Sequence, residues 1–362
     1  MAGSITADAL LEALNDGNDV QMVDVREPDE FADWSIPGAV NLPLGSLEGH
    51  LGDLDSSRPV VAVCLGGSRA ERAAALIEAG GFAVEVLAGG MGAWSTVADE
   101  VEATFGPFRL VQVRRRGKGC LSYVVAAGGS AMVVDASLDT DRYLAIAARL
   151  GTKIVAVTDT HLHADHVSGG RRLAAASGAA LLLNADDAFE YEYQPLQGID
   201  GIELGDGHRV EVTVVPTPGH TTGSTVFSLD GLAMLTGDTM FLDSVGRPDL
   251  ADRAEEFARA LYHSLRERVL AFSDDALVLP GHFSPRTEVV AGELVAATLG
   301  ELRQTLQPLT MAEEEFVAWA VAQATPRPPS YVAIVDANRF EQTLNLGELA
   351  ALEVGPNRCA IS

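Results

Sequence analysis

The sequence lacks any apolar run approaching the roughly 18 residues that a membrane-spanning helix needs, although hydrophobic residues make up 47% of its 362 residues. Its N-terminus, MAGSITADALLEALNDG, has neither the basic start nor the apolar stretch of a secretory signal. From these absences we expect a cytoplasmic protein that does not associate with membranes. Internal repeats and low-complexity tracts are absent too, and the small charged fraction of 21% indicates a globular, well-cored chain.

Basic residues and cysteines are both scarce. Lys and Arg number 25 against 51 Asp and Glu, which gives a formal net charge of −26. A chain this acidic repels nucleic-acid backbones and anionic membrane surfaces, so neither is an expected partner. The three cysteines are widely spaced: Cys64, Cys120 and Cys359. An odd number at such spacing does not indicate a disulfide framework, so each cysteine is interpreted singly.

The chain length favours two domains, and the pattern of elements changes near residue 100. Residues 1–100 alternate short strands with a helix, which is typical of a small parallel sheet. Residues 101–107 lose periodicity, end in Gly-Pro and are predicted to form a linker. Residues 108–300 contain strands joined by AGG and LDG turns, with helices between some of them, which predicts two sheets sandwiched between helices. Residues 301–362 turn helical and are expected to pack on that second domain as an extension.

Cys64 ends the predicted strand VVAV and begins the stretch CLGGSRA, directly before a helix predicted from about Ser68. Backbone N–H groups at a helix N-terminus, two glycines that let the chain curl, and the helix dipole together favour an anion. A cysteine placed there is expected to be a nucleophile with a lowered pKa, and Arg69 adds positive charge. The alternative is a buried structural thiol, which is common for free cysteine.

The C-x-x-G-x-R motif after a strand resembles the active-site loop of the rhodaneses, a sulfurtransferase family. The segments VDVREPDEF, IPGAVNLPL and LAGGMGAW resemble the same family, so the resemblance covers roughly residues 1–100. It implies that Cys64 carries sulfane sulfur as a persulfide and that the loop cradles it. The loop residues are Leu65, Gly66, Gly67, Ser68 and Arg69. Ser35 departs from the family, which often has histidine there, but that position is not the nucleophile.

A second group of chemically active residues begins with the stretch THLHADH, which holds three of the chain's eight histidines. His161 and His163 share one side of an extended segment, and Asp165 and His166 follow at the turn into a helix beginning near Ser168. Three further candidates end predicted strands: His220, Asp238 and His282. Imidazoles and carboxylates so placed suit Zn, Fe or Mn. The remaining histidines are interpreted as surface or structural residues: His50, His208 and His263.

The pattern H-x-H-x-D-H with later His, Asp and His resembles the metallo-β-lactamase fold, an αββα sandwich, over about residues 108–300. A hydrolase of this fold would bind two metal ions, with a bridging hydroxide that attacks a thioester as in glyoxalase II. The resemblance then assigns one ion to His161, His163, His220 and Asp238. It assigns the other ion to Asp165, His166, Asp238 and His282.

The same resemblance allows a second metal centre, with one Fe(II) per chain. The iron would be held by the two-histidine, one-carboxylate set of His161, His220 and Asp238. Three open positions would then take dioxygen and a persulfide sulfur. The other four residues would hold the ligands and order water without touching the metal: His163, Asp165, His166 and His282. The ligand set alone does not choose between the two centres.

Other residues resemble the persulfide dioxygenases more than the hydrolases. They are the THxHADHxSG pattern with Ala164, and the stretch GDTMFLDSVGRPDL with Arg247 and Asp249. This resemblance implies that Arg247 lies near the iron and binds the sulfur end of the substrate, whereas the alternative is an arginine in a surface loop. Pro248 varies from some members, which have threonine.

The pairing of the two domains supports a role in sulfur metabolism, because a rhodanese moves sulfane sulfur and a persulfide dioxygenase oxidises it. The expected substrate is a small thiol persulfide such as glutathione persulfide, oxidised by O2 to sulfite and thiol, with thiosulfate exchanged at the rhodanese. In similar fusions the rhodanese often follows the dioxygenase, whereas here it precedes it. One alternative is a dinuclear zinc thioesterase of glyoxalase II type with an accessory rhodanese. Another is a carrier or sensing module without catalysis, which the intact ligands and Cys64 disfavour.

The sequence leaves several features open: the carrier thiol, the metal, sulfur channelling between the sites, and the oligomeric state, a homodimer included. Cys120 opens a strand and is interpreted as a packed residue. The C-terminal GPNRCAIS either folds over the metal site, bringing Arg358 or Cys359 to a thiol, or docks on the sheet.

Overall fold

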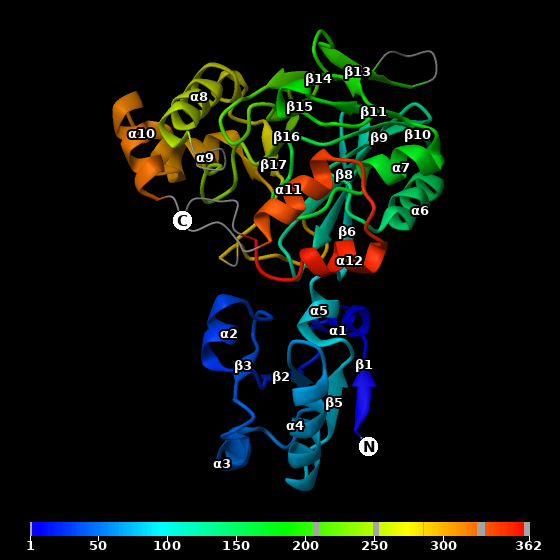
Figure 1. Ribbon diagram of the computed structural model, residues 1–362, viewed down its shortest axis with the longest axis vertical. Coiled ribbons are helices and arrows are strands. Elements are labelled where there is room, and N and C mark those ends of the chain that lie inside the picture. Colours follow the sequence, from blue (N-terminus) through cyan, green and yellow to red (C-terminus); the bar gives the residue numbers. More distant parts are fainter. Residues whose placement is uncertain (1, 206–209, 249–252, 285, 324–329, 358–362) are drawn as a thin grey trace. The chain divides into compact units, whose positions relative to one another are not determined.

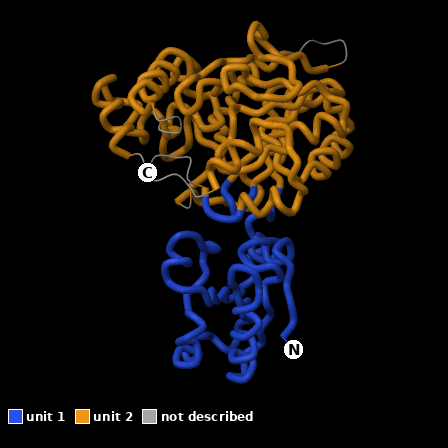
Figure 2. Tube along the Cα trace, viewed as in Figure 1, with its two compact units in different colours: residues 1–99, 115–119, 354–356 blue, residues 100–114, 120–353, 357–362 orange. Residues whose placement is uncertain are grey.

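The computed structural model describes residues 2–205, 210–248, 253–284, 286–323 and 330–357 of the chain. These residues form two compact units, coloured separately in Figure 2. The first unit comprises residues 1–99, 115–119 and 354–356, and the second comprises 100–114, 120–353 and 357–362. Within the described part of the chain, no helix is both long and apolar enough to cross a membrane.

The first unit is built on a five-stranded, all-parallel sheet with the strand order β1-β5-β4-β2-β3 (Figure 1). Its strands are β1 Gly3–Ile5, β2 Gln21–Asp24, β3 Val40–Asn41, β4 Val60–Val63 and β5 Val84–Leu87. Its helices are α1 Ala7–Asn15, α2 Pro28–Asp33, α3 Leu47–His50, α4 Ser68–Ala79 and α5 Gly90–Trp94. The parallel sheet expected from the sequence is confirmed, and α4 begins at the expected residue.

Strand β4 is the middle strand of this sheet and is covered on both faces. All four of its residues are buried, and they alternate between two apolar clusters. Val60 and Ala62 join residues of α4 in one cluster, whereas Val61 and Val63 join residues of α1 and α5 in the other. A strand covered on both faces reads as a continuous apolar run, as VVAV does.

The second unit contains two mixed sheets (Figure 1). The first has seven strands in the order β12-β11-β10-β9-β8-β7-β6. They are β6 Ala98–Phe105, β7 Phe108–Arg115, β8 Leu121–Ala127, β9 Ser130–Val134, β10 Lys153–Thr158, β11 Ala180–Leu183 and β12 Gln194–Pro195. The second has six strands, β13-β14-β15-β16-β17-β18. They are β13 Gly201–Leu204, β14 Val210–Pro216, β15 Thr225–Leu229, β16 Ala233–Gly237, β17 Leu277–Pro280 and β18 Ala297–Thr298.

Helices cover the outer faces of both sheets, which gives the αββα sandwich expected from the sequence. The shared core between the sheets includes Phe108 and Tyr123 from one sheet and Phe227 and Leu235 from the other. A separate apolar cluster joins the second sheet to α8, α9 and α10. The helices of the sandwich are α6 Thr140–Leu150, α7 Gly170–Ser177, α8 Ala254–Glu267, α9 Leu299–Thr305 and α10 Glu313–Ala322.

One part of the second unit differs from the expectation. Residues 101–107, predicted to form a linker, instead form most of strand β6 and its turn into β7. The strand lies at the edge of its sheet, and its less exposed Val101 and Ala103 alternate with exposed acidic residues that hide the pattern in the sequence.

The C-terminal part of the chain is helical, as expected. Beyond α10 it contains α11 Tyr331–Arg339 and α12 Leu346–Leu352, whose Ala337 and Leu349 pack against Val167.

Candidate metal and sulfur sites

The seven candidate metal ligands all follow strands of the second unit, and each is at most 4% exposed. Strand β10 delivers the chain to a loop of residues 159–169, the metal loop, which carries THLHADH and ends at α7. His220 follows β14, Asp238 directly follows β16, and His282 follows β17. The helix expected from about Ser168 begins at Gly170. The strand ends therefore bring the candidate residues together, as the sequence suggested.

One ligand atom from each of His161, His220 and Asp238 faces a common point. The ligand atoms of these three residues lie within 4.8 Å of one another. Asp238 Oδ2 lies 3.7 Å from His161 Nε2 and 3.5 Å from His220 Nε2. All three atoms are buried and lack a hydrogen-bond partner among the described residues. Buried polar atoms without partners are costly and rare, so three that face one another fit a bound cation.

The hydrogen bonds behind the two histidines fix the ring nitrogen that faces the centre. His220 Nδ1 lies 3.0 Å from the carbonyl oxygen of Arg247, which can only accept, so Nδ1 carries the proton and Nε2 is left with a lone pair. His161 Nδ1 lies 2.9 Å from Thr160 Oγ1, and that hydroxyl donates to Asp135. The Thr160 oxygen therefore accepts from His161, which leaves His161 Nε2 unprotonated as well. Both tautomers are those of metal ligands.

Asp135 is a support that sequence reasoning missed. Its carboxylate accepts from the Thr160 backbone N–H at 2.7 Å and from the Thr160 hydroxyl, and it lies 3.0 Å from His163 Nε2. Asp135 follows strand β9 with a φ of 56°, a left-handed conformation that is costly for residues other than glycine and clusters at functional sites. Its position after the apolar run AMVV repeats the strand-end signal used for Asp238, so it was within reach of the same argument.

His163 belongs to a different group from the three facing atoms. Its candidate ligand atom groups with those of Asp135 and Asp159, whereas its Nδ1 has no partner in the described structure. Its ring centroid lies 4.2 Å from that of His161. His163 thus packs beside His161. It also contacts Asp135, the carboxylate that accepts from Thr160 behind His161.

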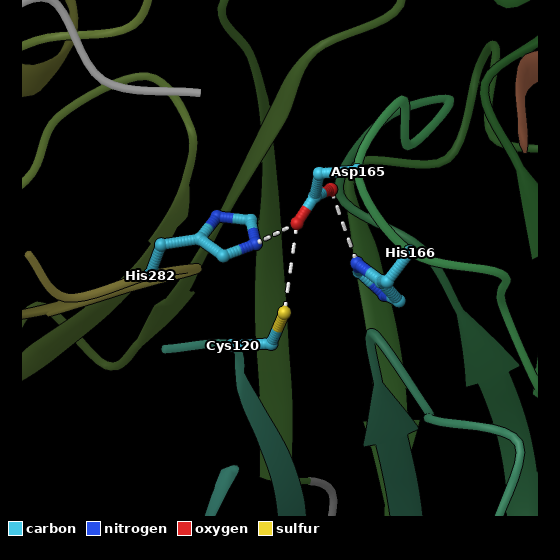
Figure 3. Close-up of side chains that lie close together, drawn as sticks. All are labelled: Cys120, Asp165, His166 and His282. Atoms are coloured by element: carbon cyan, nitrogen blue, oxygen red, sulfur yellow. Dashed lines mark hydrogen bonds and ion pairs between the residues drawn. The ribbon is translucent and has the colours of Figure 1, made fainter. Parts of the chain in front are cut away.

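The remaining candidates gather around Asp165, together with Cys120 (Figure 3). Asp165 Oδ2 lies 2.7 Å from His282 Nε2 and 3.5 Å from Cys120 Sγ, and Oδ1 lies 3.2 Å from His166 Nδ1. The His282 approach is close but lacks hydrogen-bond alignment. The expectation that Cys120 is merely packed is thus incomplete, because the residue is buried but its thiol faces these candidate ligands.

His282 connects this group to Asp238. Its Nδ1 lies 2.6 Å from Asp238 Oδ1, the carboxylate oxygen that does not face His161 and His220. Burial opposes the charged form of His282, but the neighbouring Asp165 and Asp238 carboxylates outweigh it and hold the His282 pKa well above its usual range. Burial holds the pKa values of His161 and His220 below theirs. The facing histidines are therefore neutral, as metal ligands must be.

Arg247 is buried, at 2% exposure, rather than in an exposed loop. Its carbonyl fixes His220, as described above. The preceding Gly246 leaves no room for a side chain, since a Cβ there would lie 2.0 Å from the Asp238 carbonyl oxygen and 3.0 Å from His220 Cβ. Gly246 of the GRP stretch thus lies directly against two of the three facing residues, His220 and Asp238.

Asp187 is a second support that the sequence reasoning did not identify. It is buried, and its carboxylate accepts from the backbone N–H groups of Leu162 and Gly223 at 2.7 Å each and from the Thr221 hydroxyl at 3.0 Å. It therefore ties the metal loop to the turn that follows His220. No motif marks Asp187, because its role depends on two loops that are about 60 residues apart.

In the first unit, Cys64 lies at the bottom of a loop closed by helix α4. The residue is 1% exposed, and its sulfur accepts hydrogen bonds from the backbone N–H groups of Gly67 at 3.0 Å and Ala70 at 3.4 Å. Gly67 has a φ of 108°, which a residue with a side chain rarely adopts. Leu65, by contrast, is 46% exposed. The loop therefore points N–H groups at the sulfur, as the sequence predicts.

Arg69, the basic residue near Cys64, forms an ion pair with Glu30. Its guanidinium binds both carboxylate oxygens of Glu30, at 2.6 and 2.8 Å, and this contact lowers the Glu30 pKa to about 2. Glu30 belongs to α2, in the segment VDVREPDEF. Arg69 is thus oriented by a bidentate ion pair while its charge remains near the sulfur.

The other histidines of the described chain are exposed, as expected: His50 pairs with Asp53, and His263 with Glu267 and Glu313. Four residues named in the sequence analysis lie outside the described residues: His208, Asp249, Arg358 and Cys359.

Comparison with protein families assigns each unit separately. Residues 6–96 match the family described as Rhodanese-like domain. Residues 115–282 match the Metallo-beta-lactamase superfamily.

Individual relatives fall into two groups of activity. The chain is 30% identical over 212 residues to the mitochondrial persulfide dioxygenase ETHE1 of Homo sapiens, which spans 58% of this chain and 78% of that protein. It is 40% identical over 149 residues to a hydroxyacylglutathione hydrolase of Anaeromyxobacter dehalogenans, which spans 40% of this chain and only 56% of the hydrolase. Among solved structures, ETHE1 from Myxococcus xanthus matches with a TM-score of 0.56 and 27% identity, over 64% of this chain and 97% of that one.

Proposed function

The chain belongs to the metallo-beta-lactamase superfamily, as a persulfide dioxygenase-like member with an N-terminal rhodanese-like domain, and from this premise we propose that it oxidises the persulfide of a small thiol. The substrate class is a thiol persulfide such as glutathione persulfide. In the balanced reaction, RSSH, O2 and H2O give RSH and sulfurous acid, which ionises to sulfite. The terminal sulfur is oxidised, the S–S bond breaks, and O2 is reduced.

One observation carries the proposal: two histidine nitrogens and one carboxylate oxygen face a common point without partners among the described residues. His161, His220 and Asp238 form the two-histidine, one-carboxylate set typical of non-haem Fe(II) oxygenases. When bound there, Fe(II) would supply redox chemistry and open coordination positions for O2 and a sulfur donor. The chain's own residues would orient the ligands through Thr160 and the Arg247 carbonyl.

The second oxygen of Asp238 contacts His282, which is how a single-ion centre would use it. In a dinuclear centre, Asp238 would bridge the ions through its carboxylate. Here Oδ1 is already 2.6 Å from His282 Nδ1, and His282 in turn approaches Asp165. His282 therefore supports Asp238, which agrees with an orienting role for it. The ligand atoms of Cys120, Asp165, His166 and His282 also lie within 4.8 Å of one another, so the number of bound ions is the measurement that decides between one ion and two.

Arg247 is proposed to bind the sulfur end of the persulfide. It is buried in the segment that holds His220 and packs on Asp238. A guanidinium in such a place would favour an anionic persulfide, because charge-assisted interactions are strong where water is excluded.

The rhodanese-like unit is proposed to transfer sulfane sulfur through Cys64. The N–H groups of Gly67 and Ala70 that point at the sulfur would stabilise a persulfide anion on it. Sulfite formed in the second unit and a Cys64 persulfide would give thiosulfate and the free thiol, with the sulfur atom transferred from cysteine to sulfite. The reverse reaction would load the cysteine from thiosulfate.

A dinuclear zinc thioester hydrolase is the second candidate. The observation that favours it is the 40% identity to a hydroxyacylglutathione hydrolase, together with the intact Asp165, His166 and His282. That match covers a shorter part of this chain than the match to the persulfide dioxygenase.

An oxygen-electrode assay of the full chain, reconstituted anaerobically with Fe(II), tests the choice. Glutathione persulfide should stimulate O2 uptake and yield sulfite. Hydrolysis of S-lactoylglutathione by the zinc-loaded chain, without persulfide-dependent O2 uptake by the iron-loaded one, would reject the dioxygenase and favour the hydrolase.

A further inference from the structure

The metal loop is held by the C-terminal helices as well as by its own unit's sheets. Asn338, in α11, donates from Nδ2 to the carbonyl oxygens of His163 at 2.9 Å and His166 at 2.8 Å. Its Oδ1 accepts from the backbone N–H of Ser168 at 2.8 Å. The side chain is 5% exposed. The side chain of Asn338 thus forms hydrogen bonds with three backbone groups of the metal loop.

The amide of Asn338 matches the loop in its full donor and acceptor capacity. Both Nδ2 protons meet carbonyl oxygens, and Oδ1 meets an N–H, so the amide orientation is fixed by its partners. With the amide reversed, its oxygen would face two carbonyl oxygens. Among uncharged side chains of this size, only an amide supplies two donors and one acceptor, which indicates that position 338 is adapted to this loop.

Glu353 adds a fourth hydrogen bond to the metal loop, at Val167. Its Oε1 accepts from the Val167 backbone N–H at 2.6 Å, and the carboxylate is buried at 2% exposure. Glu353 directly follows α12, whose Leu349 packs against Val167 together with Ala337 of α11. The two C-terminal helices α11 and α12 and the residue that follows α12 therefore contribute polar and apolar contacts to residues 163–168.

These bonds lead to the proposed metal ligands through a chain of contacts. The loop backbone that Asn338 holds carries Asp165, which lies 2.7 Å from His282, and His282 lies 2.6 Å from the ligand Asp238. The same backbone carries His163, which shares Asp135 with Thr160 behind His161. Movement of the loop backbone would thus disturb two of the three ligands.

We propose that Asn338 and Glu353 are positioning residues of the metal centre, through which the C-terminal helices set the geometry of the metal loop. This inference rests on the proposed metal site, but not on which reaction the metal performs. Both residues lie beyond residues 115–282, the part of the chain that matches the superfamily.

The test is anaerobic Co(II) titration of the metal-free full chain, followed by absorbance of the bound ion, with thermal unfolding of the same metal-free samples. Asn338→Asp keeps the size and the acceptor but places an oxygen against two carbonyls. We expect Co(II) binding weakened by about 10–100-fold, the range for loss of groups that orient metal ligands, with an altered Co(II) spectrum. Asn18→Asp is the matched control, because Asn18 is an exposed asparagine in the turn between α1 and β2 of the first unit, outside both the metal loop and the C-terminal helices.

Glu353 gives a second, independent pair in case the Asn338 variant does not fold. Glu353→Ala should weaken Co(II) binding, and Glu353→Gln, which keeps an oxygen acceptor for Val167, should restore most of it. The proposal is overturned if the loop variants unfold at lower temperature yet bind Co(II) with the affinity and spectrum of the unaltered chain. A chain that binds Co(II) but shows no persulfide-dependent O2 uptake with iron rejects the dioxygenase alone.

Discussion

The proposed sulfur site of the first unit and the proposed metal site of the second differ in how their parts are assembled. The sulfur site is one continuous segment, Cys64 to Ala70, in which the backbone N–H groups of Gly67 and Ala70 contact the sulfur. The metal site draws its residues from the ends of several strands between His161 and His282. A continuous loop at a helix N-terminus can form its site from local geometry, whereas a dispersed site needs each strand end held in register by other groups.

This difference appears in the supporting residues. The sulfur loop relies on Glu30, which orients Arg69, and on Gly90, which allows a close approach to the Cys64 carbonyl. The metal site relies on buried carboxylates that tie separate loops together, Asp135 and Asp187, and on the C-terminal helices. We therefore expect the metal site to be sensitive to more distant substitutions than the sulfur site.

The largest expected effect is a reciprocal loss of the two activities. His220→Ala removes a proposed ligand and should lower O2 uptake by more than about 100-fold, because even groups that only orient ligands contribute 10–100-fold. Sulfur transfer from thiosulfate to cyanide should persist. Cys64→Ser should abolish that transfer and leave O2 uptake with supplied persulfide. If either variant abolished both activities, the two sites would not be separate centres.

The next effect concerns the support behind His161. Asp135→Asn removes the charge that accepts from Thr160 and contacts His163, but asparagine tolerates the left-handed backbone at this position. Anaerobic Fe(II) binding should weaken by about 10–100-fold. Asp230→Asn is the control, since Asp230 has a similar φ of 51° but lies at an exposed turn. Equal affinities in the two variants would contradict a supporting role for Asp135.

A smaller effect tests how closely the backbone at Gly90 packs against the Cys64 carbonyl group. A Cβ at Gly90 would lie 2.1 Å from the Cys64 carbonyl oxygen, and Gly90 has a φ of 56°, whereas a Cβ at Gly66 meets nothing within 4 Å. Gly90→Ala should destabilise the first unit by about 1–3 kcal/mol through overpacking and backbone strain and reduce sulfur transfer. Urea unfolding followed by fluorescence reports this, because Trp34 and Trp94 lie in that unit. Gly66→Ala should leave the unfolding midpoint unchanged; equal shifts would show that the approach is not tight.

The smallest effect is the ion pair of Glu30 with Arg69. Because this partly exposed pair lowers the Glu30 pKa from 4.5 to about 2, its stabilisation is present above pH 4.5 and lost as the pH falls towards 2. Glu30→Gln should destabilise the first unit by less than about 1 kcal/mol at pH 7. The difference in urea midpoint between variant and unaltered chain should shrink at pH 3. A difference that grows with acidity would have the wrong sign.

The comparison also explains which features the sequence could predict. The Cys64 loop and the strands around it were predictable, because a strand, two glycines and a helix start are all local patterns. The seven candidate ligands were predictable from their places after apolar runs. Their division into three facing and four supporting residues was given only by family resemblance, as one of two alternatives, because spacing alone does not give side-chain directions in two packed sheets.

Other supports carried weaker signals. Asp135 follows a strand and could have been found by the same rule as Asp238. Asn338 lies in α11, which follows a proline-rich stretch, and Glu353 follows α12; their partners are backbone atoms about 170–186 residues away. Strand β6 was missed because its solvent-facing acidic residues hide the alternation. Long-range pairing, rather than local pattern, decided each of these cases.

The central claim is a single catalytic metal held by His161, His220 and Asp238. The direct measurement is the number of Fe(II) ions bound per chain at saturation, in the unaltered protein and in His282→Ala. If these three residues hold a single ion, we expect one ion in the unaltered protein and still one, bound more weakly, in the variant. Two ions in the unaltered protein that fall to one in the variant would contradict it and indicate a dinuclear centre.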